Sequence, residues 1–126
     1  MLIDENILKI TPSDEVNGCG PKRFGNWVRD KILGLSIKNA GNIHDCHYYW
    51  LSKMKSKSCE SQVLKDFDGY LWKRLCRGKD YADSIFLKNM TIINNNSSSK
   101  KFIKKLRLPI IKSYFLAVRF FGIYFL

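Results

Sequence analysis

Apolar side chains recur at helical spacing over residues 36–55. Positions 37, 40, 44, 48 and 51 follow one another at intervals of three or four residues, so they share one face of a helix. The side chains on this face are Ile37, Ala40, His44, Tyr48 and Leu51. The polar segment KSKS at 55–58 interrupts the pattern. The spacing therefore predicts a helix over 36–55 that ends at this segment.

A second helical pattern runs from Cys59 to about Cys76, and Gly78 is a plausible stop. Its stripe consists of Glu60, Val63, Leu64, Phe67, Leu71 and Leu75. Two amphipathic patterns separated by a short polar segment indicate a mainly α fold with two antiparallel helices packed face to face.

The remaining segments are less regular. Residues 1–16 contain a short apolar stretch followed by the turn sequence TPSD, and residues 17–25, NGCGPKRFG, contain three glycines and a proline, which indicates a loop. The polar run NNNSSSKK at 94–101 is typical of a linker. The apolar run 110–126 is short for a membrane span, and either an interfacial segment or a third packing helix or strand fits it.

Composition limits the class of protein. The chain has 126 residues, of which 45% are apolar, so we expect one domain with a packed core. Its formal net charge of +11 predicts attraction to polyanions, either nucleic acid or an anionic lipid surface. The acidic amino terminus lacks the pattern of an export signal.

The four cysteines permit two disulfides in three connectivities. There is no CxxC pair, so a zinc ribbon is disfavoured, and a mixed metal site would have to draw on Cys46, His47 and Cys59.

The stretch NIHDCHYYW at 42–50 carries candidate chemistry. His44 lies on the apolar face of its helix, which suits a neutral base, while Asp45 lies about 100° round. If the two helices pack antiparallel, Glu60 can face His44 and Tyr48 and accept hydrogen bonds from both. The structural alternative is a surface histidine together with a glutamate that only caps a helix.

Taken in order, NGCGPKRFG, HDCHY and KSKSCESQVLKDF resemble the secreted phospholipase A2 enzymes, most closely their group XII branch. The resemblance covers roughly residues 17–76. It implies a phospholipase A2-like core over 17–78 with a glycine-containing calcium loop, preceded by an N-terminal segment (1–16) and followed by a divergent basic and apolar C-terminal region (79–126).

The resemblance implies the following roles. His44 would be the base that activates a water molecule, with Glu60 and Tyr48 holding its ring. Asp45 would bind Ca²⁺ together with backbone carbonyls of Gly18, Gly20 and Lys22. Oxygen ligands suit calcium. The reaction would be hydrolysis of the sn-2 ester of phospholipids at an anionic membrane, by a secreted protein with disulfides.

Two departures from the family pattern stand out. Glu60 replaces an aspartate, and Asp66 lies about 240° from it on the predicted helix, so Glu60 is the preferred partner of His44. Ala40 and Gly41 replace paired cysteines, and Cys46 is rotated by about 100° from the family position, which makes a Cys46–Cys59 bridge doubtful. The alternatives are therefore an inactive relative that binds lipid or protein, and a basic nucleic-acid-binding protein, which no motif supports.

Overall fold

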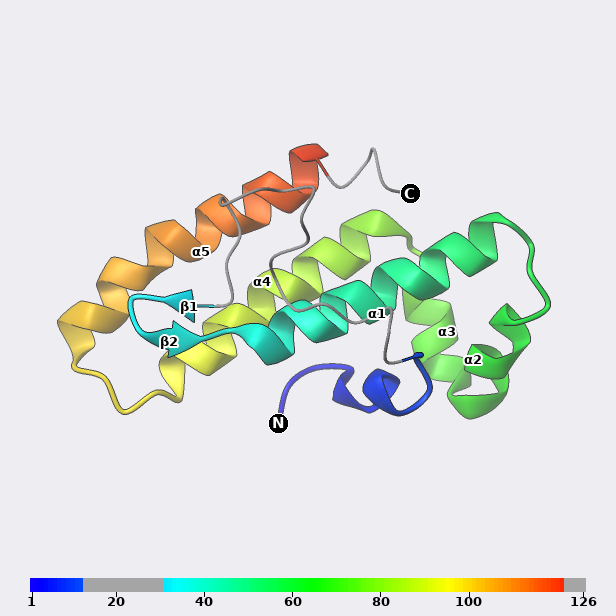
Figure 1. Ribbon diagram of the computed structural model, residues 1–126, viewed down its shortest axis with the longest axis horizontal. Helices are drawn as coiled ribbons and strands as arrows, with labels where there is room; N and C mark the ends of the chain where they lie inside the picture. The colour runs from blue at the N-terminus through cyan, green and yellow to red at the C-terminus, as the bar shows by residue number, and fades with distance from the viewer. Residues whose placement is uncertain (13–30, 122–126) are drawn as a thin grey trace.

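The chain folds into a mainly helical structure (Figure 1). This structure, a computed structural model, describes residues 1–12 and 31–121. Its elements, in chain order, are the 3₁₀-helix η1 (Glu5–Lys9), the strands β1 (Lys31–Ile32) and β2 (Leu35–Ser36), and the helices α1 (Lys38–Lys55), α2 (Ser61–Phe67), α3 (Gly69–Leu75), α4 (Lys79–Asn95) and α5 (Lys101–Phe121).

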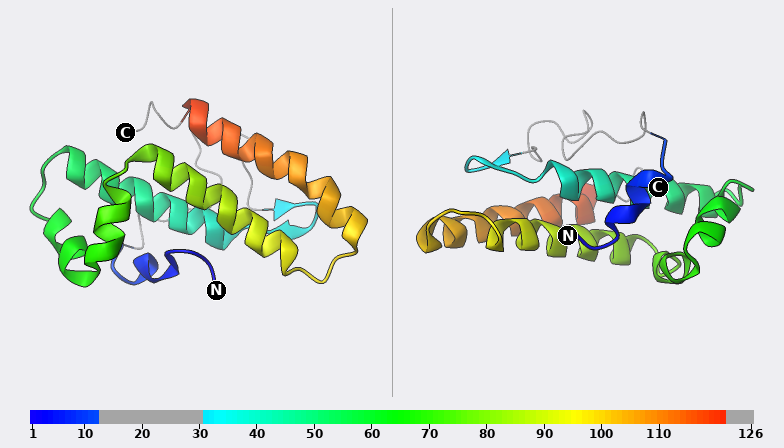
Figure 2. Two further views of the ribbon diagram at one scale, coloured as in Figure 1. Left: turned by 180° about the vertical axis from the view of Figure 1, so that it is seen from behind. Right: turned by 90° about the horizontal axis from the view of Figure 1, so that it is seen from below.

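Helices α1, α4 and α5 form the body of the molecule in two layers. Figure 2 shows α4 and α5 side by side in one layer, with α1 and the hairpin in the other. The antiparallel partner of α1 is α4, whereas α2 and α3 cover only the end of α1 near Lys55. The predicted mainly α fold is confirmed, but the predicted pairing of the helix over 36–55 with the helix over 59–76 is wrong.

Two groups of buried apolar side chains hold the layers together. The first joins α1, α4 and α5 with β1, and it includes Ile37, Phe86, Met90 and Ile111. The second joins α1 and α4 with η1, α2 and α3, and it includes Ile7, Ile43, Trp50, Leu71 and Ile85. Each side chain named here is at most 4% exposed, so burial of these side chains is the main stabilising contribution.

Asp68 divides the predicted second helix into α2 and α3. Its backbone is extended, and its carboxylate accepts hydrogen bonds from the backbone N–H groups of Tyr70 and Leu71, at 3.0 and 3.1 Å. This is N-capping, which starts a new helix at Gly69. The chain turns at this point, so the predicted continuous stripe does not form. Leu64 and Leu71 are buried, whereas Val63 is 52% exposed.

The strands β1 and β2 make a two-residue hairpin whose turn residues, Leu33 and Gly34, have φ angles of 45° and 80°. Positive φ at both positions is typical of the turn that matches strand twist. The buried guanidinium of Arg107 on α5 donates a hydrogen bond to the Leu33 carbonyl at 3.0 Å, which ties the hairpin to α5.

The basic and apolar segment near the C-terminus forms α5, which packs against α4. Ile111 and Val118 on its inner face are 1% and 2% exposed, so a packing helix, one of the alternatives left open for residues 110–126, forms as far as Phe121. The helix includes Pro109, which lacks the N–H that would bond to the carbonyl of Lys105. Among the described residues, no helix has the length and hydrophobicity needed to cross a membrane.

Candidate functional site

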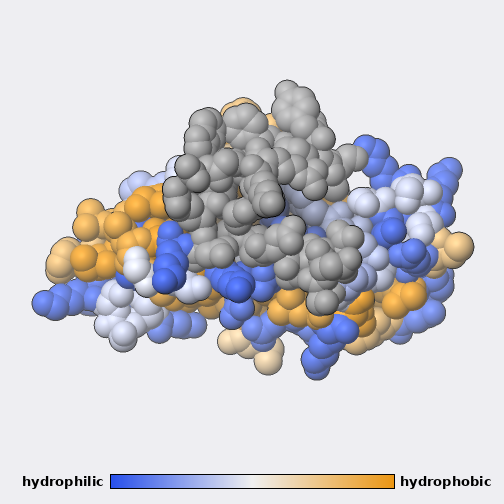
Figure 3. Space-filling model, in the orientation of Figure 1, coloured by the Kyte–Doolittle hydropathy of each residue, from blue (hydrophilic) through white to orange (hydrophobic). Residues whose placement is uncertain are grey.

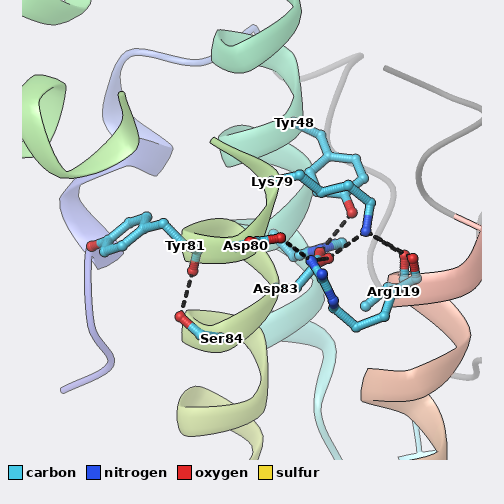
Figure 4. A network of polar contacts seen from close by, with 9 residues as sticks. Tyr48, Lys79, Asp80, Tyr81, Asp83, Ser84 and Arg119 are labelled. Carbon is cyan, nitrogen blue, oxygen red and sulfur yellow. Dashed lines mark hydrogen bonds and ion pairs between the residues drawn. The ribbon is translucent and has the colours of Figure 1, made fainter. Parts of the chain in front are cut away.

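The carboxylate of Asp83 lies at the centre of a buried polar network between α1, α4 and α5 (Figure 4). One carboxylate oxygen, Oδ1, bonds to Nε2 of His44 at 2.8 Å and accepts a hydrogen bond from the hydroxyl of Tyr48 at 2.6 Å. His44 and Tyr48 are one turn apart on α1, so both reach the same oxygen across the helix pair. The sequence pattern placed His44 and Tyr48 on one face of the helix, and in the structure both bond to the carboxylate of Asp83.

The second oxygen of Asp83, Oδ2, is held by two cations. It accepts hydrogen bonds from Lys79 at 2.5 Å and from Arg119 at 3.1 Å. The Lys79 ammonium also donates to the backbone carbonyls of Val118 and Arg119, and the Arg119 guanidinium also pairs with Asp80. These contacts dock the C-terminal part of α5 onto the carboxylate.

Aromatic rings fix the orientation of the His44 imidazole. The ring of Phe86 stacks on it with centroids 4.6 Å apart, and the ring of Tyr48 lies 4.2 Å away, tilted by 46°. His44 is 5% exposed and Phe86 1%, so the imidazole is held between packed rings.

The protonation states in this network follow from burial and hydrogen bonding. Burial alone would raise the pKa of Asp83, but the hydrogen bond and charge of His44, with the bonds of Lys79 and Tyr48, lower this pKa to about 2. Burial lowers the pKa of His44 below its ordinary value, although Asp83 opposes the shift. Burial, the charge of Asp83 and the hydrogen bond to it raise the pKa of Tyr48, so its hydroxyl stays a donor.

An ionised Asp83 decides the tautomer of His44. A carboxylate can only accept hydrogen bonds, so Nε2 of the neutral imidazole carries the proton and Nδ1 keeps its lone pair. Of the two ring nitrogens, Nε2 is the one that bonds to a described side chain, the carboxylate of Asp83. The arrangement of a base, an orienting carboxylate and a second donor to that carboxylate is one that general-base catalysis uses.

Glu60 does not have its predicted place beside His44. Its carboxylate accepts a hydrogen bond from the Tyr49 hydroxyl at 3.0 Å, pairs with Lys53 at 3.3 Å, and is 57% exposed. Glu60 precedes α2 as its N-cap residue and lies by the outer side of α1, whereas His44 faces α4. The rival Asp66 is also exposed and bonds to Gln62.

Part of the predicted calcium site lies outside the described residues, namely Gly18, Gly20 and Lys22. Asp45 is described: it follows His44 on α1 and is partly exposed. Among the described residues no three His, Cys, Asp or Glu side chains gather into a possible metal site. The mixed cysteine site is not formed, because Cys46 is buried and Cys59 exposed, and both are free thiols.

A second buried carboxylate, Asp4, ties the N-terminal segment to the helices. It bonds to His47 of α1 at 3.1 Å, to Arg74 of α3 at 3.0 Å, and to the hydroxyl of Tyr81 of α4. Its side chain is 3% exposed. Because these partners come from three helices, Asp4 has a structural role that the sequence pattern did not indicate.

Asp83 was not among the residues singled out from the sequence, although a signal for it exists. It is followed at intervals of three and four residues by Phe86 and Met90, which are buried on the same face of α4. A carboxylate on an apolar stripe needs a partner, and Glu60 was likewise placed on the apolar stripe of its predicted helix. The same test applied to residues 79–95 finds Asp83.

In comparisons with known proteins, no protein-family model, no curated protein and no solved structure matches this chain.

Proposed function

We propose that this protein is a calcium-dependent phospholipase A2 in which His44 is the general base and Asp83, rather than Glu60, orients it. The observation that carries the proposal is the 2.8 Å bond from His44 to a buried carboxylate that also accepts from Tyr48. The motifs NGCGPKRFG and HDCHY, which resemble the secreted phospholipases A2, give the reaction class. The proposal includes a fold of that type, with α1 and α4 as the antiparallel pair.

In this proposal Nδ1 of His44 takes a proton from a water molecule whose oxygen attacks the carbonyl carbon of the sn-2 ester. The imidazolium that forms is stabilised by the charge of Asp83. It then returns the proton to the glycerol oxygen as the ester bond breaks, giving a fatty acid and a lysophospholipid. Tyr48, Lys79 and Arg119 keep the carboxylate of Asp83 ionised and in place.

Calcium would be held by the carboxylate of Asp45 with the backbone carbonyls of Gly18, Gly20 and Lys22. Such a site uses mainly backbone oxygens, which suit a hard cation, and so needs no cluster of acidic side chains. When bound, the ion would polarise the ester carbonyl. The substrate would be a phospholipid in a membrane, with anionic membranes favoured by the net charge of +11.

The experiment is fatty-acid release from mixed phospholipid vesicles with calcium and with a chelator. We expect calcium-dependent release that falls by about 10²–10⁴-fold in His44→Gln and Asp83→Asn, because each removes the oriented base. Glu60→Gln is the matched control and should keep nearly full activity, since Glu60 is exposed and bonds to Tyr49 and Lys53.

Two outcomes would count against the proposal. Loss of activity in Glu60→Gln with activity kept in Asp83→Asn would return the orienting role to Glu60. Absence of release from the wild-type protein at saturating calcium would instead favour a catalytically inactive module that binds lipid or protein.

A further inference from the structure

The face of α5 that points away from the core is apolar and exposed to solvent. Phe102 is 59% exposed, Leu106 56%, Leu116 50% and Phe120 69%. These four side chains, here called the outer stripe, are far more exposed than apolar side chains of a packed helix. Large apolar side chains exposed on one face commonly mark a surface that binds a partner or a membrane.

The four members of the outer stripe lie on one side of the helix. At about 100° per residue its four members fall within roughly 80° of arc, opposite Ile111 and Val118 of the inner face. Pro109 and Ser113 lie between them on the same side, and both are exposed. The 21 residues of α5 give a strip about 30 Å long, which is enough to lie along a bilayer surface.

Lysines follow one edge of the outer stripe. Lys101, Lys105 and Lys112 are exposed and lie about 60–100° to the same side of Phe102 in helical projection. The helix contains no aspartate or glutamate. In Figure 3 hydrophobic surface gathers at the end of the molecule where α5 begins, with hydrophilic surface beside it.

We propose that the outer stripe docks this protein on anionic lipid bilayers, with its phenylalanines and leucines in the interfacial region and the three lysines against lipid phosphates. Apolar side chains with a lysine edge are typical of helices that lie in the membrane plane. Each lysine near an anionic surface adds to binding. A second copy of the chain fits less well, because α5 offers no carboxylate to pair with the lysines of its partner.

The docked helix is also joined to the catalytic candidates. Arg119, one residue before the last member of the outer stripe, contacts Asp83, and the backbone carbonyls of Val118 and Arg119 accept from Lys79. The role of the outer stripe in holding the enzyme at its substrate rests on the proposed function. Its binding to lipid does not, because vesicle binding is measured without any hydrolysis.

The test is co-sedimentation of the full chain with vesicles of phosphatidylglycerol and phosphatidylcholine, compared with phosphatidylcholine alone. We expect binding to the anionic vesicles to weaken at least about tenfold in Phe102→Ser/Phe120→Ser. Lys105→Gln/Lys112→Gln should weaken it about tenfold and remove the preference for anionic lipid.

Matched controls lie on α2 and α3. Val63→Ser/Phe67→Ser removes exposed apolar side chains (52% and 41%), and Lys65→Gln/Lys73→Gln removes exposed lysines. Both should bind within about twofold of wild type. Because every substituted side chain is exposed, circular dichroism and the thermal midpoint should be nearly unchanged, which confirms that the variants are folded.

The proposal is overturned if the wild-type chain does not bind anionic vesicles, or if the α5 and control variants bind equally. It is also overturned if the wild type sediments as a dimer in solution and Phe102→Ser/Phe120→Ser is a monomer, because the outer stripe then binds a second copy.

Hydrolysis of a dispersed short-chain phosphatidylcholine tests the enzyme without a surface. His44→Gln should bind vesicles like wild type, so loss of activity and loss of docking are separated.

Discussion

At the scale of single residues, the carboxylate of Asp83 combines four partners from three helices. One oxygen bonds to His44 and Tyr48 of α1, and the other to Lys79 of α4 and Arg119 of α5. The side chain of Asp83 is fully buried, so its charge has no access to water that could replace a lost partner. Breaking such a network is costly, because Lys79, whose side chain is 15% exposed, would keep a largely buried charge without its carboxylate.

Replacing Asp83 by asparagine should therefore destabilise the protein as well as reduce activity. We expect the free energy of unfolding of Asp83→Asn to fall by about 3 kcal/mol, measured by urea denaturation, since Lys79 loses its carboxylate and Arg119 is left with its exposed pair with Asp80. Asp80→Asn is the matched control: Asp80 pairs with the same Arg119 but is 81% exposed, and its replacement should cost at most about 1 kcal/mol. Equal losses in the two variants would show that burial does not determine the energy of this network.

The same residues show how far the site could be predicted from sequence. Periodicity correctly placed His44 and Tyr48 on one inward face, because helical geometry depends only on local spacing. It could not supply the partner, since Asp83 is 39 residues from His44 in the chain and the two meet only through the packing of α1 on α4. Glu60 was selected by assuming that helices adjacent in sequence pack face to face.

At the scale of elements, local signals were enough for α1 but not for the segment after it. The apolar pattern and the polar segment at 55–58 predicted a helix over 36–55, and α1 runs over Lys38–Lys55. Over 59–76 the pattern was read as continuous although Asp68 precedes Gly69, a start signal for a new helix. The Asp68 side chain caps a new helix and interrupts the apolar stripe, so residues 59–76 form two short helices, α2 and α3.

The capping contact of Asp68 makes a prediction about α3. Asp68→Ala removes the acceptor for the N–H groups of Tyr70 and Leu71, which should lower the free energy of unfolding by about 1 kcal/mol in urea denaturation. Asp66→Ala, two residues earlier, removes an exposed carboxylate that accepts a hydrogen bond from Gln62, so a change within about 0.5 kcal/mol is expected. A larger loss for Asp66→Ala than for Asp68→Ala would contradict the assignment of the cap.

At the scale of the whole molecule, two buried carboxylates hold segments that are distant in sequence to the α1–α4 pair. Asp83 connects this pair to α5, and Asp4 connects it to the N-terminal segment and α3. Apolar burial supplies most of the stabilisation, but these ion pairs determine which polar groups face one another. Neither could be predicted from local pattern, because the partners that join each carboxylate to another element are at least 35 positions away in the chain.

The Asp4 cluster predicts how the stability of the molecule depends on pH. Burial alone would raise the pKa of Asp4, but hydrogen bonds with His47, Tyr81 and Arg74 lower it from 3.8 to about 2. Between these values the unfolded chain binds a proton that the folded chain does not. The contribution of Asp4 is therefore fully present above the unfolded value and is lost as the pH falls toward 2.

Replacing Asp4 by asparagine removes this dependence while keeping a residue that tolerates the backbone φ of 60°. We expect Asp4→Asn to be less stable than wild type by about 2 kcal/mol at neutral pH, with the difference shrinking as the pH falls from 4 to 2. Urea denaturation at a series of pH values measures both curves. Glu5→Gln is the control, because the Glu5 side chain makes no hydrogen bond with the described residues, and its curve should run parallel to wild type. If the free energies of unfolding of Asp4→Asn and wild type differ by the same amount down to pH 2, the charge of Asp4 does not stabilise the contact of the N-terminal segment with the helices.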